Sequence, residues 1–280
     1  MKYTKLVLLV VIFILLGSCQ SGNGKPRGYV VLSPELAEIL CAIGAEDNIL
    51  AVTNECDYPH SLASKAKVGS FSAIDVEAII ALNPEMVFVS ALEQEGSAAQ
   101  LKKLGIRVEV IYPKSLSELS QEILRLGEIS GNSKQAANLV ADMKQSLAQV
   151  KAETDGKAKP KVYLEIYRDP LMSVSDASFV GELIETAGGD NIFPTLERDY
   201  ARVNPEAVIK AKPDIMICYS QDSLQNIMAR KGWQDIPAIR NGKIYFEKDI
   251  SPDIIQRATP RSIDGIWAMY KLFHGEKDEE

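Results

Sequence analysis

The clearest pattern of apolar and polar positions in the chain occurs twice. Residues 71–90 (FSAIDVEAIIALNPEMVFVS) and 200–219 (YARVNPEAVIKAKPDIMICY) align without a gap at a constant offset of 129. In each copy a short segment with one apolar face ends before a proline, because the residue that precedes proline is disfavoured in the helical region. A continuous apolar run follows, which is typical of a strand covered on both faces. Each copy therefore predicts a helix, a tight turn and a buried strand.

A repeat of this length indicates two related lobes rather than stacked short units. Further strand-length apolar runs alternate with amphipathic segments in both halves. They lie at residues 29–32, 49–53 and 108–111 in the first half and at 161–166 and 244–246 in the second. Strands that alternate with helices predict an α/β fold, with a mainly parallel sheet flanked by helices in each lobe.

The segment between the halves has the pattern of a helix. Ser115-Leu116-Ser117-Glu118 matches a capping box, and apolar residues then recur at helical spacing as far as Val150, with Gly131-Asn132 as a candidate interruption. We expect one long, rigid helix to join the lobes and to limit how far they open. The expected boundaries are an N-terminal lobe at 27–113, a connecting helical segment at 114–153, a C-terminal lobe at 154–275 and a charged tail at 276–280.

The N-terminus has the pattern of an export signal. Two lysines precede an apolar run at residues 6–16, which is shorter than the roughly 20 residues that span a bilayer. This predicts a signal peptide over residues 1–18. Leu16-Gly17-Ser18-Cys19 resembles the bacterial lipobox, in which the cysteine is acylated. Residues 19–26 would then form a lipidated tether, and the folded part would lie in the cell envelope, in the periplasm or outside the cytoplasmic membrane.

Composition narrows the possible functions. The chain has 280 residues, 46% hydrophobic and 25% charged, and its net charge of -7 argues against a nucleic-acid partner. Its length allows two cores of ordinary size. A disulfide between Cys41 and Cys56 stays open, since pairing cannot be derived from sequence. No spacing of cysteine and histidine suggests a metal site.

Catalytic motifs are missing from the sequence. It contains no G-x-S-x-G, P-loop or G-x-G-x-x-G motif, and its only histidines are His60 and His274. Ser33, followed by proline and an acid, suits a helix N-cap better than a nucleophile. An α/β scaffold alone does not exclude an enzyme. A binding protein, which is not an enzyme, is the better interpretation.

Six short segments resemble the substrate-binding proteins of the cobalamin, haem and ferric-siderophore ABC importers, and most closely the cobalamin-binding members. They are Val31-Leu32-Ser33-Pro34, Asp57-Tyr58-Pro59, Val68-Gly69-Ser70-Phe71, Ile80-Ala81-Leu82-Asn83-Pro84-Glu85, Gly188-Gly189-Asp190-Asn191-Ile192-Phe193 and Arg257-Ala258-Thr259-Pro260-Arg261. The resemblance covers residues 27–273. It implies a monomer that holds a macrocyclic ligand in a cleft between its lobes. It also implies delivery of that ligand to a permease dimer with its ATPase subunits, without a cofactor of its own.

The resemblance assigns docking to one glutamate on each lobe, and Glu77 and Glu206 occupy those positions. The duplication supports this independently, because a two-lobed protein that meets a two-fold symmetric partner presents the same charge twice. Each glutamate also falls in the first turn of a predicted helix, where the helix dipole favours an acid by roughly 0.3–1 kcal/mol. Both interpretations can hold together.

The same resemblance suggests ligand-binding residues. Phe71 and Tyr200 match positions where cobalamin-binding relatives place tryptophans that face the cleft, and aromatic side chains suit a broad macrocycle. The alternative is that they are ordinary core aromatics. Asp253 and Arg257 match an Asp-x-x-x-Arg pair near the ligand, although this spacing also suits a simple ion pair on a helix surface.

Three further candidates are less directly supported. Glu55 stands where the cobalamin binder has an aromatic residue, while Tyr167 and Met172 lie after the first strand of the second half. The expected ligand is cobalamin or a related corrinoid. The alternative is a ferric siderophore or haem, for which arginines would supply a basic cleft and a tyrosine or histidine would bind the haem iron. These arginines are Arg168, Arg202, Arg257 and Arg261.

Overall fold

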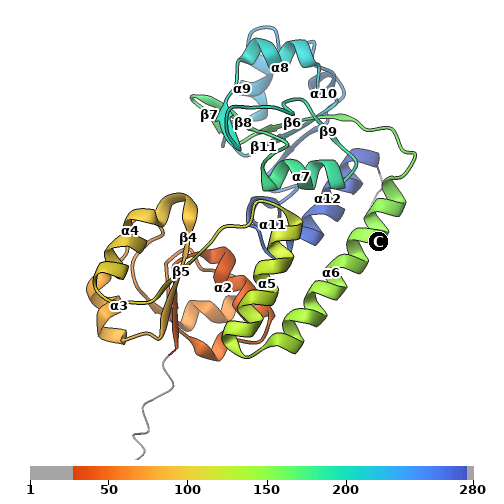
Figure 1. Cartoon of the computed structure of the whole chain (residues 1–280). Helices are drawn as coiled ribbons and strands as arrows, with labels where there is room; N and C mark the ends of the chain where they lie inside the picture. Colours follow the sequence, from red (N-terminus) through yellow and green to blue (C-terminus); the bar gives the residue numbers. More distant parts are fainter. Residues whose placement is uncertain (1–27, 276–280) are drawn as a thin grey trace, which may run out of the picture.

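Two α/β lobes joined by helices make up the computed structural model, which describes residues 28–275 (Figure 1). The predicted signal peptide, Cys19, the tether and the charged tail lie outside the described residues. The model confirms the predicted fold class. No helix in the range 28–275 has the length and apolar character needed to cross a membrane.

The N-terminal lobe contains a parallel five-stranded sheet in the order β3-β2-β1-β4-β5. Its strands are β1 (Tyr29–Val31), β2 (Ile49–Val52), β3 (Ala66–Lys67), β4 (Met86–Ser90) and β5 (Val108–Ile111). Its helices are α2 (Pro34–Ala42), α3 (Val76–Leu82) and α4 (Ala91–Lys103), with short 3₁₀ turns at η1 (Glu46–Asn48) and η2 (His60–Ser64). Helix α2 begins as predicted, since the Ser33 side chain accepts a hydrogen bond from the Leu36 N–H and Pro34 occupies the first helical position.

The C-terminal lobe contains a parallel sheet in the order β12-β11-β6-β9 and an antiparallel sheet in the order β10-β8-β7. The strands are β6 (Lys161–Glu165), β7 (Tyr167–Arg168), β8 (Leu171–Val174), β9 (Asp190–Asn191), β10 (Tyr200–Arg202), β11 (Ile215–Cys218) and β12 (Ile244–Phe246). The helices are α7 (Phe179–Thr186), α8 (Pro205–Ala211), α9 (Leu224–Ala229), α10 (Pro237–Arg240), α11 (Pro252–Gln256) and α12 (Ser262–His274). The antiparallel sheet has no counterpart in the predictions.

The repeated pattern forms the same structure in both lobes. Helices α3 and α8 have seven residues each, and side chains of Asp75 and Asn204 cap their N-termini. Each helix ends at a residue with a left-handed backbone, Asn83 (φ 46°) or Lys212 (φ 53°), directly before proline. The fully buried strands β4 and β11 follow. The predicted helix, turn and buried strand are therefore confirmed in both copies.

The connecting segment is a helical hairpin rather than one helix. Helix α5 (Leu116–Ser130) ends at Gly131, whose φ of 76° reverses the chain, and α6 (Ser133–Thr154) follows. The 22 residues of α6 span roughly 33 Å. Helix α6 runs from the N-terminal lobe to the C-terminal lobe (Figure 1). The candidate interruption at Gly131-Asn132 is thus the turn of the hairpin, and the crossing helix is shorter than the predicted segment.

The largest cluster of buried apolar side chains is shared by both lobes. It extends from Leu40 in α2 through Leu126 and Met143 in the hairpin to Leu183 and Ile266 in the C-terminal lobe. Smaller clusters lie against the remaining faces of the two parallel sheets. The length of the chain allows two separate cores, but the largest apolar cluster is continuous between the lobes. Because close-packed interiors resist deformation, a shared core disfavours large separations of the lobes.

The three described cysteines are free thiols, so the possible bridge between Cys41 and Cys56 is not formed. Burial raises the pKa of the Cys41 thiol to about 12. The Cys56 sulfur lies 3.4 Å from the Thr53 hydroxyl, and Cys218 is buried in β11. These side chains serve as small packing groups.

Candidate ligand-binding site

A small cavity, about 30 Å³ in volume, lies between the lobes, and we refer to it as the inter-lobe cavity. The N-terminal lobe contributes the start of α2, the last residue of β4, and the end of β5 with the two residues that follow it. The C-terminal lobe contributes α7, β10 and the end of α11. The lining side chains include Ser33, Glu35 and Tyr112 from the first lobe and Phe179, Tyr200 and Gln256 from the second.

Tyr200 is the predicted site residue that lines this cavity. It is half-buried at the start of β10, opposite Val174 in the antiparallel sheet. Burial, with smaller contributions from Tyr112, Asp199 and Glu35, raises the pKa of the Tyr200 hydroxyl. The pKa of the Tyr112 hydroxyl is raised in the same way. Both side chains are therefore neutral at physiological pH and offer aromatic surface together with a hydroxyl group.

Phe71 and Glu55 come together in the N-terminal lobe, away from the cavity lining. The backbone N–H of Phe71 donates to Glu55 Oε2 at 2.8 Å. The buried side chain of Gln94 donates to the carbonyl oxygens of Leu32 (2.7 Å) and Phe71 (3.1 Å). The Glu55 carboxylate thus holds the backbone of the loop that carries Phe71, a role that the sequence did not suggest.

Tyr167 and Met172 occupy the small antiparallel sheet with Tyr200. Met172 pairs with Tyr167 on one side and with Arg202 on the other. Directly paired residues share a face of the sheet, as do alternate residues of one strand. Tyr167, Met172 and Arg202 therefore lie on the same face as Tyr200. Tyr167 is exposed, with 55% of its surface accessible to solvent.

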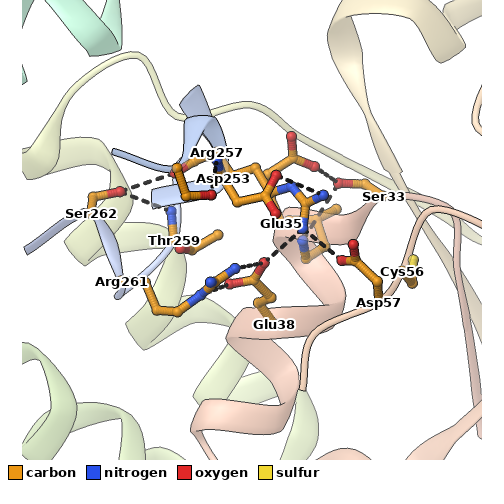
Figure 2. Close-up of polar contacts among 12 residues, drawn as sticks. Ser33, Glu35, Glu38, Cys56, Asp57, Asp253, Arg257, Thr259, Arg261 and Ser262 are labelled. Atoms are coloured by element: carbon orange, nitrogen blue, oxygen red, sulfur yellow. Dashed lines mark hydrogen bonds and ion pairs between the residues drawn. The ribbon is translucent and has the colours of Figure 1, made fainter. Parts of the chain in front are cut away.

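Asp253 and Arg257 form the ion pair that their spacing allows, at 3.0 Å. Arg257 also reaches across to the N-terminal lobe, 2.8 Å from Asp57 Oδ1 and 3.2 Å from Glu38 Oε1. Arg261 holds the same Glu38 through two hydrogen bonds of 2.8 and 2.6 Å. Figure 2 shows these five residues, the Glu38 network, between α2 and the region of α11.

The Glu38 network brings three carboxylate groups together with two guanidinium groups. Glu38 is only 3% exposed, and its buried carboxylate is paired with the two arginines. Burial opposes ionisation of Asp57, but its hydrogen bond to Arg257 and the nearby positive charges lower the pKa of the Asp57 carboxyl. The Arg261 guanidinium also lies 3.8 Å from the centre of the Tyr58 ring. The structure therefore places Arg257 and Arg261 in contacts between the lobes.

The candidate docking glutamates are both accessible. Glu77 and Glu206 each occupy the second position of a helix, α3 and α8 respectively, and both are exposed. Their backbones are equivalent, as the repeat predicts. Both also benefit from the helix dipole, so the two interpretations drawn from the sequence remain compatible.

Several cavity residues were not predicted as site residues. Glu35 appeared in the sequence only as an acid in the first turn of a helix, and Phe179 and Gln256 carried no signal. Tyr112 had a usable signal, because it directly follows the predicted strand β5. Ligands of open α/β sheets bind beyond the carboxyl ends of parallel strands.

The family model described as "Periplasmic binding protein" matches residues 30–250. The chain belongs to this family. Membership confirms the resemblance to substrate-binding proteins of the cobalamin, haem and siderophore importers. This periplasmic binding protein is accordingly a binding protein rather than an enzyme, and it works outside the cytoplasm with an ABC importer permease.

Two relatives agree with this assignment. An uncharacterized ABC transporter substrate-binding lipoprotein of Bacillus subtilis, YvrC, is 30% identical, with 86% of this chain and 78% of the relative covered. A vitamin B12-binding protein of Vibrio parahaemolyticus is 24% identical, with 98% of each chain covered.

Two solved structures have the same fold as this periplasmic binding protein. The vitamin B12-binding protein BtuF of Vibrio cholerae matches with a TM-score of 0.78 at 22% identity, covering 91% of this chain and 99% of BtuF. The S. aureus protein IsdE, complexed with heme, matches with a TM-score of 0.76 at 21% identity, covering 90% of this chain and 94% of IsdE. At such identities these likenesses bear on the fold alone.

Proposed function

We propose that this protein captures cobalamin or a related corrinoid and delivers it to an ABC importer. The observation that carries the proposal is the inter-lobe cavity, where Tyr112, Phe179 and Tyr200 supply aromatic surface from both lobes. Aromatic side chains suit a broad, partly apolar macrocycle. Relatives named as vitamin B12-binding proteins support the same ligand. The corrinoid is cargo, and no chemistry on it is required.

The proposal includes the remaining parts of a delivery system. Cys19 would carry a lipid that holds the tether at a membrane, as the lipobox pattern predicts and as a lipoprotein relative supports. The folded part would act as a monomer. Glu77 and Glu206 would contact the permease dimer, which works with its ATPase subunits. Mass spectrometry of the purified mature protein tests the lipid, because acylation at Cys19 adds a defined mass.

A second candidate ligand is haem, since Tyr112 and Tyr200 both line the cavity and a tyrosine can bind haem iron. A ferric siderophore, as an anionic chelate, would need a basic cleft. The arginines considered for that purpose are largely committed elsewhere: Arg168 lies 3.1 Å from Asp222, while Arg257 and Arg261 bind acids of the Glu38 network. Charge therefore favours a ligand without strong negative charge.

Direct binding measurements decide between these ligands. Purified full-length protein is titrated with cyanocobalamin, haemin and a ferric siderophore, with calorimetry and absorbance as readouts. We expect cyanocobalamin to bind with a Kd below about 1 μM, which corresponds to about 8 kcal/mol of binding free energy. Tyr200→Ala should weaken that binding by at least about tenfold through lost aromatic contact. Weaker binding of cyanocobalamin than of haemin would contradict the proposal.

A further inference from the structure

The inter-lobe cavity contains a carboxylate with an open hydrogen-bonding position. Glu35 lies in the first turn of α2, and the Ser33 hydroxyl donates to its Oε2 atom (Figure 2). Among the contacts formed by residues 28–275, Oε1 accepts no hydrogen bond. A carboxylate has room for about four donors. Glu35 can therefore accept further hydrogen bonds from a molecule in the cavity.

The opposite lobe contributes to the same cavity a residue whose side chain carries an unsatisfied donor. Gln256, the last residue of α11, also lines the cavity. Its Nε2 atom is buried and has no hydrogen-bond partner within the described residues. Leaving a buried donor unpaired costs free energy, so native structures nearly always satisfy such groups. A ligand group that accepts a hydrogen bond in the cavity would supply the partner that this amide lacks.

Positive charge does not line this cavity. None of its described lining side chains belongs to lysine or arginine. Arg257, which follows Gln256 in the chain, is held by Glu38, Asp57 and Asp253. An anionic group placed here would meet the Glu35 charge in a partly desolvated setting, which is unfavourable. A neutral group that both donates and accepts would satisfy both protein side chains.

We propose that Glu35 and Gln256 together recognise a primary carboxamide of the ligand. The amide NH₂ donates to Glu35 and the amide C=O accepts from Gln256 Nε2. This rests on the proposed function and deepens it, because primary carboxamides surround the corrin ring of cobalamin. Haem instead bears propionates, and many siderophores bear carboxylates or catecholates. The Glu35 charge disfavours anionic groups, so the pair favours a corrinoid over haem or an anionic siderophore.

Carboxamide recognition is tested with ligands in which a carboxamide group is replaced by a carboxylic acid. Full-length protein is titrated by calorimetry with cyanocobalamin and with its monocarboxylate derivatives, in each of which one carboxamide has been hydrolysed. We expect at least one derivative to bind about tenfold more weakly, the scale of one lost charge-assisted hydrogen bond. Glu35→Gln should reduce that discrimination to about twofold or less, since the repelling charge is gone. Gln256→Ala should weaken cyanocobalamin itself by about fivefold, the scale of one hydrogen bond.

Glu128→Gln is the matched control. It removes the same charge from an exposed position on α5, so we expect the discrimination of the unaltered protein. Equal affinity of the unaltered protein for cyanocobalamin and every monocarboxylate would overturn carboxamide recognition while leaving the corrinoid function intact. The same holds if a folded Glu35→Gln variant keeps the full discrimination. If the unaltered protein fails to bind cyanocobalamin at all, both proposals fall together.

Discussion

Glu38 shows how a single buried charge can hold distant parts of the chain together. Arg257 and Arg261 lie 219 and 223 positions further along the sequence, yet both bind its carboxylate. The attraction within a buried ion pair is offset by the cost of removing both charges from water. Removal of one partner is different, because it leaves the other charge buried and unpaired. Glu38 is therefore a sensitive position for stability.

We predict that Glu38→Gln lowers the free energy of unfolding by about 3 kcal/mol, the range found when one partner of a buried pair is removed. Urea denaturation followed by circular dichroism measures this value. The exposed Glu128→Gln variant should change it by less than about 0.5 kcal/mol. Equal effects of the two substitutions would mean that water, rather than Glu38, satisfies the two arginines.

The contacts of single residues were only partly predictable from the sequence. The pair Asp253 and Arg257 was expected, because a spacing of four brings side chains together on one helix. The partner of Arg257 in α2 was not, since no local periodicity relates positions so far apart. Glu35 was missed for a similar reason. An acid in the first turn of a helix is already explained by the helix dipole, so nothing in the sequence assigned it to a site. Its position at the inter-lobe cavity depends on residues of the other lobe, which local sequence does not identify.

At the scale of elements, the hairpin of α5 and α6 depends on close approach of the two helices. A Cβ atom added at Gly127 in α5 would lie 2.4 Å from the Cβ atom of Ala136 in α6. The sequence predicted helical structure on both sides of Gly131 and marked Gly131-Asn132 as a candidate interruption of one long helix. It did not predict the reversal at Gly131, because a glycine break is compatible with a kink as well as with a turn.

We predict that Gly127→Ala lowers the free energy of unfolding by about 1–3 kcal/mol through overpacking of this contact. Gly96→Ala is the matched control, since Gly96 is an exposed position within helix α4 and an added Cβ would meet nothing within 4 Å. There the change should stabilise by about 0.5–1 kcal/mol, because alanine favours the helix. Chemical denaturation of both variants checks the opposite signs, and stabilisation by Gly127→Ala would contradict the tight packing.

At the scale of the whole molecule, the duplication preserves one half of its pattern more strictly than the other. Glu77 and Glu206 have equivalent backbone positions, and both are exposed. The aromatic positions differ: Tyr200 lies on a strand at the inter-lobe cavity, while Phe71 lies in a loop held by Glu55 and Gln94. Local pattern predicted helix, turn and strand in both lobes. The environment of each aromatic depends on neighbours that the repeat does not include.

Glu77 and Glu206 occupy the same position in equivalent helices, which suits docking to a two-fold symmetric partner. We predict that Glu77→Lys combined with Glu206→Lys leaves the Kd for cyanocobalamin unchanged but abolishes uptake by cells or vesicles that contain the permease, because both contacts become repulsive. Glu128→Lys combined with Glu185→Lys alters the net charge equally at exposed sites and should retain uptake. Loss of uptake in both double variants would point to long-range charge steering instead. Weaker binding of cyanocobalamin by the variant with Glu77→Lys and Glu206→Lys would mean that these glutamates contribute to the cleft or to the fold rather than to docking.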